Sequence, residues 1–437
     1  MRPSIGIRRE TKSPWERRSP VTPALARHLI KDNGMTVFVQ PSARRIFPDA
    51  DYTRAGATLT TSLDDANIIL GVKEVPPELL NRNSTYLFFS HVIKGQPTNM
   101  PMLRRIMDLG CTLIDYEKIA DDQGRRLVFF GRFAGLAGMI DSLWALGQRL
   151  QEEGIRTALR ELSPSHQYED LEAAKAAVRA AGERIADDGL PDGLPPLVIG
   201  IAGYGNVAKG AREILAELPT REVTPAELLE LKKPSAHCMY QVTFTEGDVV
   251  RPVEAGHAFE LQDYYDHPER YESDFARFLP HLSLLMNCNY WEERYPRLVT
   301  TAEIRSLYRA PEAPRLKVIG DLGCDVDGSI QCTLKCTEPG DPVYVYDVDS
   351  DDIARGFSGR GPTILAVDIL PTELPLEASE EFAKALASIL PSLGNADFGA
   401  PFEDLDIPPE IARAVIVHRG ELTPDFQYLE AHLNTGE

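Results

Sequence analysis

A lysine and a histidine stand in the same relation to two short apolar runs. Lys73 closes the stretch IILGVK and His91 closes YLFFSH, with Lys94 three residues further on. Short apolar runs bounded by polar residues are typical of strands buried on both faces of a parallel sheet. Residues at the carboxyl ends of such strands line the crevice in which α/β proteins bind ligands. A lysine and a histidine there can share acid–base catalysis. This interpretation is favoured over a surface lysine and a core histidine without function.

Positive charge is concentrated at the start of an otherwise acidic chain. The 437 residues include 46 Lys and Arg against 66 Asp and Glu, a formal net charge of −20, yet six of the first 18 residues are basic. This local excess indicates a site for an anion, and the alternative is a solvated basic face. A chain this acidic repels nucleic acids and anionic membranes, so neither is an expected partner.

A third apolar run, 112–115, precedes two further candidates. Glu117 follows it directly, and Arg126 lies beyond on an expected hairpin. Glu117 could orient a cation, and Arg126 could bind a carboxylate through two parallel hydrogen bonds. Taken alone, each could equally be without function.

The stretch LVIGIAGYGNVAKGA predicts a dinucleotide-binding loop. An apolar strand over 197–202 leads into a GxGxxA pattern, and a helix follows. Gly203 allows the tight turn, Gly205 lets the backbone approach a pyrophosphate, and Ala208 permits close packing of helix on strand. The order of strand, loop and helix favours nucleotide binding over a plain strand–helix turn.

The nucleotide itself is left open. A ribose-binding acid should end the second strand about 20 residues further on, and we expect that strand within 219–225. Glu222 there would favour NAD, whereas Arg221 could receive a 2′-phosphate. A later strand, 317–321, should bring carboxylates near the nicotinamide ribose.

The predicted elements define an α/β fold of two Rossmann-like parallel-sheet domains with a cleft between them. Domain one, the substrate and catalytic domain, takes residues 1–135 and is completed by about 365–437. Linking helices occupy 136–196, starting within an apolar helix over 133–150, and the dinucleotide-binding domain takes 197–364. Further strands and helices are expected as follows: strands over 5–9, 36–39, 66–71, 85–89, 363–370 and 408–418, and helices over 23–32 and 376–390.

Neither a metal nor a membrane is expected. Six cysteines are scattered without a CxxC pair, and nine histidines form no ligand cluster, so we predict reduced thiols and no metal. No run approaches the roughly 20 apolar residues that span a bilayer. The first residues lead straight into a strand without a signal-peptide core, which predicts a cytoplasmic protein.

Eight motifs occur in the following order along the chain: RRETKSPWERRSPVTP, GVKEVPPELL, FFSHVIKGQ, LIDYEKI, FFGRFAGLAGMID, GYGNVAKGA, DYYDHPERY and NCNYWEERYPRLVT. With these motifs the chain resembles the lysine–2-oxoglutarate reductase half of the bifunctional aminoadipic semialdehyde synthases of animals and plants. The resemblance covers nearly the whole chain. The same fold, with Arg, Lys and His at matching places, belongs to fungal lysine-forming saccharopine dehydrogenase, alanine dehydrogenase and the NAD domain of transhydrogenase.

The resemblance implies that lysine and 2-oxoglutarate condense to an imine, which NADPH reduces to saccharopine in lysine degradation. Lys73 and His91 resemble the acid–base pair, and Arg18 resembles the arginine that binds the substrate carboxylate. Further active-site positions are matched by Lys94, Glu117 and Arg126. The cofactor positions are matched by Gly203, Tyr204, Gly205, Asn206, Val207, Asn287 and Asp325, with Arg221 as the candidate for a 2′-phosphate.

The chain also departs from the family pattern. Val-Thr-Pro stands at 223–225 where Val-Glu-Pro is expected, and this loss of a carboxylate favours NADP(H), with NADH as the alternative. The saccharopine-cleaving half is expected to be absent, so a separate saccharopine-oxidising enzyme is a candidate partner, as is a second copy of the chain. Two alternatives stay open: a related dehydrogenase acting on another amine or keto acid, and a nucleotide-sensing module without turnover.

Overall fold

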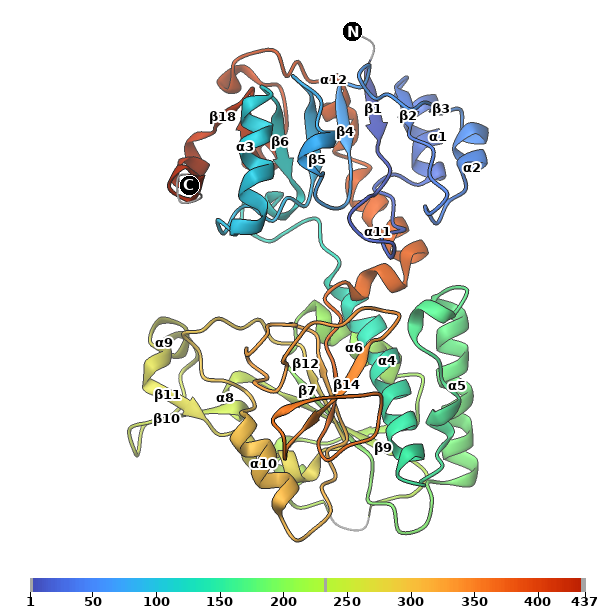
Figure 1. Ribbon diagram of the computed structural model, residues 1–437, viewed down its shortest axis with the longest axis vertical. Coiled ribbons are helices and arrows are strands. Elements are labelled where there is room, and N and C mark those ends of the chain that lie inside the picture. The colour runs from blue at the N-terminus through green and yellow to red at the C-terminus, as the bar shows by residue number, and fades with distance from the viewer. Residues whose placement is uncertain (1–2, 232–233, 434–437) are drawn as a thin grey trace. The chain divides into compact units, whose positions relative to one another are not determined.

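The computed structural model describes residues 3–231 and 234–433, so Arg2 of the basic N-terminal stretch lies outside the described residues. The chain divides into two compact units (Figure 1). Unit 1 comprises Met1–Phe130 and Pro375–Glu437, and unit 2 comprises Gly131–Leu374. Each unit is built on its own eight-stranded sheet.

The sheet of unit 1 has the strand order β18-β17-β6-β5-β4-β1-β2-β3. Strands β1 to β6 run parallel to their neighbours, as predicted, while β17 lies antiparallel to β6 and β18 antiparallel to β17. The antiparallel edge was not expected from the sequence. The strands are β1 Ser4–Ile7, β2 Thr36–Val39, β3 Thr58–Leu59, β4 Ile68–Leu70, β5 Thr85–Phe88, β6 Thr112–Asp115, β17 Val415–His418 and β18 Glu421–Leu422.

Helices cover this sheet, and the first of them shows how the sequence specifies them. Helix α1 has Pro23 at its first position, and the hydroxyl of Thr22 accepts a hydrogen bond from the Leu25 N–H. Leu25 and Leu29 then face the core. The helices of the unit are α1 Pro23–Lys31, α2 Asp49–Ala55, α3 Met100–Asp108, α11 Pro375–Leu386, α12 Leu390–Asn395, α13 Pro409–Ala412 and α14 Glu430–Leu433.

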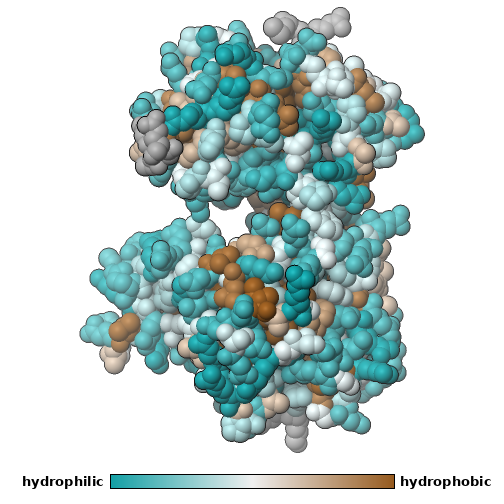
Figure 2. Space-filling view, in the orientation of Figure 1, coloured by the Kyte–Doolittle hydropathy of each residue, from teal (hydrophilic) through white to brown (hydrophobic). Residues whose placement is uncertain are grey.

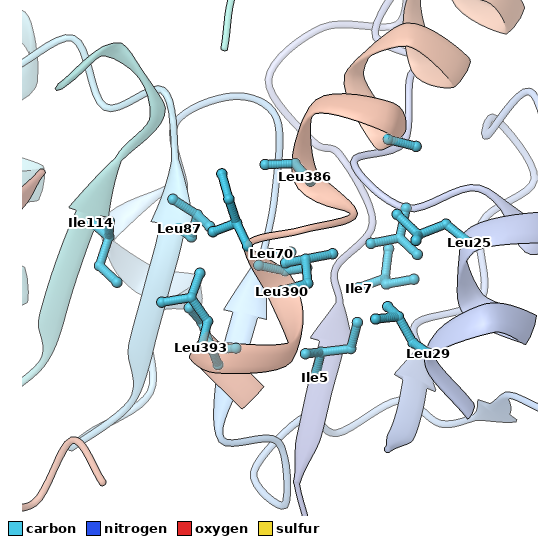
Figure 3. Close-up of a cluster of buried hydrophobic side chains, with 14 of the residues drawn as sticks. Ile5, Ile7, Leu25, Leu29, Leu70, Leu87, Ile114, Leu386, Leu390 and Leu393 are labelled. Atoms are coloured by element: carbon cyan, nitrogen blue, oxygen red, sulfur yellow. The ribbon is translucent and has the colours of Figure 1, made fainter. Parts of the chain in front are cut away.

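The C-terminal segment completes the first unit, as predicted. Leu386, Leu390 and Leu393 come from α11 and α12 or their ends and pack into the cluster formed by β1, β4 and β5 (Figure 3). Buried aliphatic side chains each stabilise a fold by about 1.5–3 kcal/mol. Unit 1 therefore depends on residues more than 300 positions apart in the chain.

The sheet of unit 2 has the strand order β15-β14-β16-β13-β12-β7-β9-β8. In this order, the six strands from β16 to β8 run parallel to their neighbours in the sheet. Strands β14 and β15 add an antiparallel edge beside β16. A separate antiparallel pair is formed by β10 and β11. The strands are β7 Val198–Ala202, β8 Thr220–Glu222, β9 Met239–Phe244, β10 Val250–Pro252, β11 Tyr271–Ser273, β12 Leu284–Asn287, β13 Val318–Asp321, β14 Val343–Asp347, β15 Asp352–Arg355 and β16 Thr363–Leu365.

The second strand expected in the nucleotide fold forms, and it lies at the edge of the sheet. The stretch 219–225, interpreted as the second strand of the nucleotide fold, does contain β8, but β9 lies between β8 and β7. Residue order along the chain does not determine strand order, because pairing is decided by packing and register. The strand next to the glycine-rich loop is therefore β9, whose carboxyl end is Phe244.

The segment 136–196, expected to link the two domains, belongs to unit 2. Its long helix α4 packs so closely on α6 that a Cβ at Gly135 would lie 1.9 Å from the Val207 carbonyl oxygen, and one at Gly210 would lie 2.1 Å from the Arg132 carbonyl oxygen. Glycine at both contact points allows this approach. The helices of the unit are α4 Gly131–Glu152, α5 Leu171–Asp188, α6 Asn206–Leu215, α7 Pro225–Leu229, α8 Glu246–Val249, α9 Leu261–Asp266 and α10 Thr301–Arg309.

A buried carboxyl pair ties α4 to two distant segments of unit 2. Asp141 on α4 accepts a hydrogen bond from the Ser165 N–H at 2.6 Å, and Glu373 accepts one from the Ser165 hydroxyl at 2.7 Å. Burial, with the charge of Glu373, raises the pKa of Asp141 well above its usual range. Burial therefore favours the protonated form of Asp141.

The face of the chain seen in Figure 2 is mostly hydrophilic, and hydrophobic residues gather in a patch on unit 2. Across residues 3–231 and 234–433, no helix combines the length and the apolar character needed to cross a bilayer.

Candidate active site and dinucleotide loop

The predicted catalytic residues follow neighbouring parallel strands of unit 1. Strands β4, β5 and β6 lie side by side, with Leu70 opposite Leu87 and Phe88 opposite Asp115. Because parallel strands end at the same edge of a sheet, the segments after them emerge together. Lys73, His91 and Glu117 stand on these segments, and the segment with Arg18 follows the adjoining strand β1.

His91 is held by a carboxylate that the sequence analysis missed. Its Nδ1 lies 2.8 Å from Oε1 of Glu74, and its ring stacks on Phe89 with the ring centroids 6.4 Å apart. A carboxylate oxygen only accepts, so Nδ1 carries the proton and Nε2 remains to exchange one. The His91 backbone has a φ of +51°, a rare conformation outside glycine that is found at functional sites.

Glu74 is ionised in this arrangement. Burial by itself would raise its pKa, but the hydrogen bond and charge of His91, helped by Lys12 at 3.7 Å, hold the pKa of Glu74 at about 2. Its second oxygen, Oε2, is buried without a hydrogen-bond partner. Glu74 follows Lys73 directly in GVKEV. This position next to the predicted catalytic lysine was the one sequence feature that could have identified Glu74 as a site residue.

The Glu74–His91 pair predicts a pH dependence of stability. Because the folded pKa of Glu74 lies below the ordinary 4.5, its contribution is complete above pH 4.5 and disappears as the pH falls towards about 2. We expect Glu74→Gln to abolish this component, worth about 2–4 kcal/mol, in urea unfolding across this pH range. The matched variant Glu78→Gln, at an exposed position, should keep it. An unchanged profile in Glu74→Gln would show that the pair does not form in solution.

The backbone at Lys73 is held by Glu10, a second carboxylate that the sequence analysis did not identify. Glu10 accepts hydrogen bonds from the N–H groups of Val72 at 2.8 Å and Lys73 at 3.2 Å, and it forms an ion pair with Arg8 at 3.3 Å. Burial raises the pKa of Glu10 in spite of Arg8. The end of β4, and with it Lys73, is thereby attached to the segment after β1.

Arg18 is buried and already paired. Its Nε and Nη2 donate to the two oxygens of Glu16 at 2.8 and 2.6 Å, and its guanidinium lies over the ring of Phe130 at 4.2 Å. Phe130 packs against Phe89, the ring on which His91 stacks. Arg18 therefore shares an aromatic cluster with His91, but Glu16 occupies two of its three nitrogens.

Glu117 and Arg126 form an ion pair, with Arg126 Nη1 3.6 Å from Glu117 Oε1. An antiparallel bridge between Ala120 and Arg126 places the arginine on the predicted hairpin. The buried Asp115 accepts from the Glu117 N–H at 2.7 Å and from the Ser90 N–H at 3.0 Å, so it joins the two strand ends.

Lys94 is exposed in a turn after His91, where no helix forms. The side-chain amide of Asn99 donates to the His91 carbonyl at 3.1 Å and fixes the start of this turn. The structure therefore places Lys94 at the outer part of the candidate site.

In unit 2, the glycine-rich loop has the geometry that a pyrophosphate requires. Gly203 has a φ of +104°, and a Cβ there would lie 2.6 Å from Asn289 Oδ1. A Cβ at Gly205 would meet no heavy atom within 4 Å, so the space above this residue is open, and Ala208 lies on the buried side of α6. Asn206 and Val207 begin α6, whose N–H groups point to that space. The residues fit a dinucleotide.

The other predicted cofactor residues differ in their surroundings. The buried Asn287 donates to Asp321 at 2.8 Å, and Thr333 donates to the other Asp321 oxygen at 2.6 Å. Burial raises the pKa of Asp321, and Asp325 follows in the loop after this strand. Arg221 is exposed on the edge strand β8, with β9 between it and β7.

Gly205→Ala is expected to weaken dinucleotide binding without changing the stability of the fold. The added methyl group meets no protein atom, and a φ of −74° suits alanine, so stability should be unchanged within about 0.5 kcal/mol. The same methyl group would occupy the approach of a pyrophosphate, and we expect roughly tenfold weaker dinucleotide binding by calorimetry. Gly203→Ala, at positive φ, should instead destabilise the fold. Undiminished binding by Gly205→Ala would remove the loop from the site.

Within the described residues, no three or more His, Cys, Asp or Glu side chains gather where they could hold a metal ion.

Similar proteins carry the same sequence features. The chain is 39% identical over 97% of its length to the alpha-aminoadipic semialdehyde synthase of Arabidopsis thaliana and 36% identical over 98% to the mitochondrial enzyme of Rattus norvegicus. It spans 41% and 48% of these relatives. It is 27% identical to the Emericella nidulans saccharopine dehydrogenase [NAD(+), L-lysine-forming], covering 89% of this chain and 91% of that protein.

Solved structures agree in fold. An L-alanine dehydrogenase superposes with a TM-score of 0.63 at 18% identity, covering 98% of this chain and 99% of its own, and a Sinorhizobium meliloti transhydrogenase superposes with 0.56 at 16%, covering 96% and 100%. Residues 6–137 match the family described as alanine dehydrogenase/PNT, N-terminal domain. The resemblance that the motifs predict is confirmed: the chain has the alanine dehydrogenase fold and is similar over nearly its whole length to part of the aminoadipic semialdehyde synthases.

Proposed function

We propose that the chain is an oxidoreductase that condenses the ε-amine of L-lysine with the keto group of 2-oxoglutarate and reduces the imine to saccharopine. The observation that carries the proposal is the Glu74–His91 pair beside Lys73 at one sheet edge. The names of the relatives, aminoadipic semialdehyde synthase and saccharopine dehydrogenase, support an enzyme of lysine and saccharopine metabolism.

His91 and Lys73 supply the proton transfers. Glu74 holds the proton on Nδ1, so Nε2 of His91 can take a proton from the lysine ammonium, and the free amine then attacks the keto carbon. Lys73 gives a proton to the hydroxyl that leaves the carbinolamine as water. When bound, the nicotinamide dinucleotide supplies the hydride that reduces the imine carbon.

Cationic side chains suit the carboxylates of 2-oxoglutarate. Arg126 is 44% exposed and its 3.6 Å pair with Glu117 is loose, so it can exchange that partner for a substrate carboxylate. Arg18 is fixed by Glu16 and acts from a buried, rigid position. Lys94 adds an exposed positive charge at the outer side.

The reductant is NADPH or NADH, held by the glycine-rich loop and by Asn287 and Asp325. The expectation of NADP(H) rests on the resemblance and on the missing carboxylate at 223–225, and it stays a prediction, with NADH as the alternative. Three further points stay predictions: the cytoplasmic location, assembly with a second copy of the chain, and a separate saccharopine-oxidising partner.

A screen of amines and keto acids tests the substrates. With each reduced nicotinamide, we expect lysine and 2-oxoglutarate to give the highest kcat/KM and a product with the mass of saccharopine. A clearly better pair of other substrates would assign the chain to a related imine-forming dehydrogenase. Tight dinucleotide binding without turnover of any pair, unaffected by His91→Gln, would indicate a nucleotide sensor.

A further inference from the structure

Two arginines of the basic N-terminal stretch have no part in the candidate active site. Arg8 and Arg9 follow β1 directly, and both line a cavity of about 390 Å³ within unit 1. The walls come from the segments after β1, β2 and β3 and from the stretch 75–81, and the described lining residues include neither Lys73 nor His91. A cavity of this volume is large enough for a small organic ligand.

The cavity carries an unpaired charge of each sign. Arg9 and Glu78 both line it and are both exposed. Within the described residues, neither the Arg9 guanidinium nor the Glu78 carboxylate forms a hydrogen bond or an ion pair, with each other or with a third group. Opposite charges held apart in one cavity can be bridged by a ligand that carries both charges itself.

The two walls are fixed by hydrogen bonds. On one side, Gln40 accepts from the Arg9 N–H at 3.1 Å and donates to the Thr61 carbonyl at 3.1 Å. On the other side, the Asn81 amide donates to Asp64 at 2.8 Å and joins the loop after β3 to the segment that carries Glu78. Polar groups that are already held in place lose little conformational freedom when a ligand binds.

Arg8 connects this cavity to the backbone of Lys73. It is buried, its Nη1 lies 3.3 Å from Glu10, and its Nη2 donates to the Thr11 hydroxyl at 3.0 Å. A Cβ at Gly71 would lie 3.0 Å from the Arg8 Cδ, so the arginine packs against the end of β4. Glu10 in turn accepts from the Lys73 N–H. An anion that binds Arg8 therefore competes with the carboxylate that holds the Lys73 backbone.

We propose that this cavity is a regulatory site for a free α-amino acid with an uncharged side chain. The carboxylate of the ligand binds Arg9 and Arg8, and its ammonium group binds Glu78. Occupation of the site weakens the contact between Arg8 and Glu10, loosens the backbone at Lys73 and lowers turnover. The effect on turnover rests on the proposed function, in which Lys73 is catalytic, whereas the binding site does not.

The site is tested by calorimetric titration of the full chain with L-glutamine, without dinucleotide, lysine or keto acid. The amide of this probe is uncharged and suits the hydroxyl and amide groups of the cavity wall. We expect a dissociation constant of about 1 mM or lower. N-acetyl-L-glutamine keeps the carboxylate but has no ammonium group, and it should bind at least roughly tenfold more weakly.

Three variants locate the bound probe. Arg9→Gln and Glu78→Gln should each weaken L-glutamine binding at least roughly tenfold. Arg126→Ala is the matched control, because it removes an exposed arginine of the candidate active site that does not line the cavity. It should keep the wild-type affinity. Thermal melting without ligand checks that each variant folds.

The regulation is tested by adding L-glutamine to the steady-state assay. We expect the kcat of the wild type to fall about fivefold or more at saturation, and the kcat of Arg9→Gln to be unaffected by the same concentration of the probe. A wild-type kcat that does not change when the probe is bound would overturn the regulatory role.

Absence of binding to the wild type would overturn the site, and so would undiminished binding by folded Arg9→Gln and Glu78→Gln variants. Binding that is lost in Arg126→Ala would assign the probe to the active site instead. A chain that binds L-glutamine through Arg9 and Glu78 but forms no saccharopine would refute the proposed function, and the regulation with it, and leave the binding site standing.

Discussion

Lys73→Met and His91→Gln are each expected to lower kcat by roughly 10²-fold or more, the usual contribution of a positioned acid or base. The structure gives a specific reason for His91, because Glu74 fixes the proton on Nδ1 and leaves Nε2 as the exchanging nitrogen. Glutamine cannot exchange a proton there, and methionine keeps the length of Lys73 without its charge. Steady-state rates with both substrates saturating measure the effect.

Two exposed positions provide matched controls on α1. His28 also pairs with a carboxylate, Asp32, with its Nδ1 2.6 Å from the nearer oxygen, and Lys31 ends the helix. His28→Gln and Lys31→Met should therefore keep wild-type turnover. Near wild-type kcat in Lys73→Met or His91→Gln would remove that residue from the mechanism. A loss of stability in proportion to the loss of rate would point to a structural role instead.

Arg18→Ala is expected to destabilise the chain by about 3–5 kcal/mol, because it leaves the charge of Glu16 buried without its partner. The side chains of Arg18 and Glu16 are only 3% and 1% exposed, and the lost guanidinium also covers the ring of Phe130. Urea unfolding measures this loss. Under conditions in which the variant is folded, its KM for the keto acid should rise.

Arg126→Ala is the contrasting variant. Arg126 pairs with Glu117 at the surface, so its removal should cost less than about 1 kcal/mol while also raising the keto-acid KM. Replacing Arg18 and Glu16 together should restore part of the stability lost in Arg18→Ala, since no buried charge then remains alone. Wild-type stability in Arg18→Ala would contradict the buried pair, and an unchanged KM would exclude Arg18 from substrate binding.

Local sequence predicted the elements of the fold better than their arrangement. The apolar runs at 36–39 and 112–115 match β2 and β6 in both bounds, because a buried strand needs apolar residues on both faces. The antiparallel addition of β17 to β6 and the insertion of β9 between β7 and β8 could not be predicted. Both depend on pairings between residues far apart in the chain.

In the candidate site, too, individual residues were predicted better than the contacts between them. Lys73 and His91 were predicted because each follows a buried run, and their strands are indeed neighbours. Their carboxylate partners Glu74 and Glu10 were not, because hydrogen-bond partners depend on how side chains point once the strands have paired. The ribose-binding acid was sought at the end of the second strand along the chain, and the insertion of β9 between that strand and β7 could not be predicted.

The central claim, that this chain joins lysine to 2-oxoglutarate by reduction, is tested most directly by following the absorbance of reduced nicotinamide in the purified protein. We predict rapid oxidation that requires both lysine and 2-oxoglutarate. Oxidation at the background rate with either cofactor, or oxidation that does not need lysine, would contradict the claim.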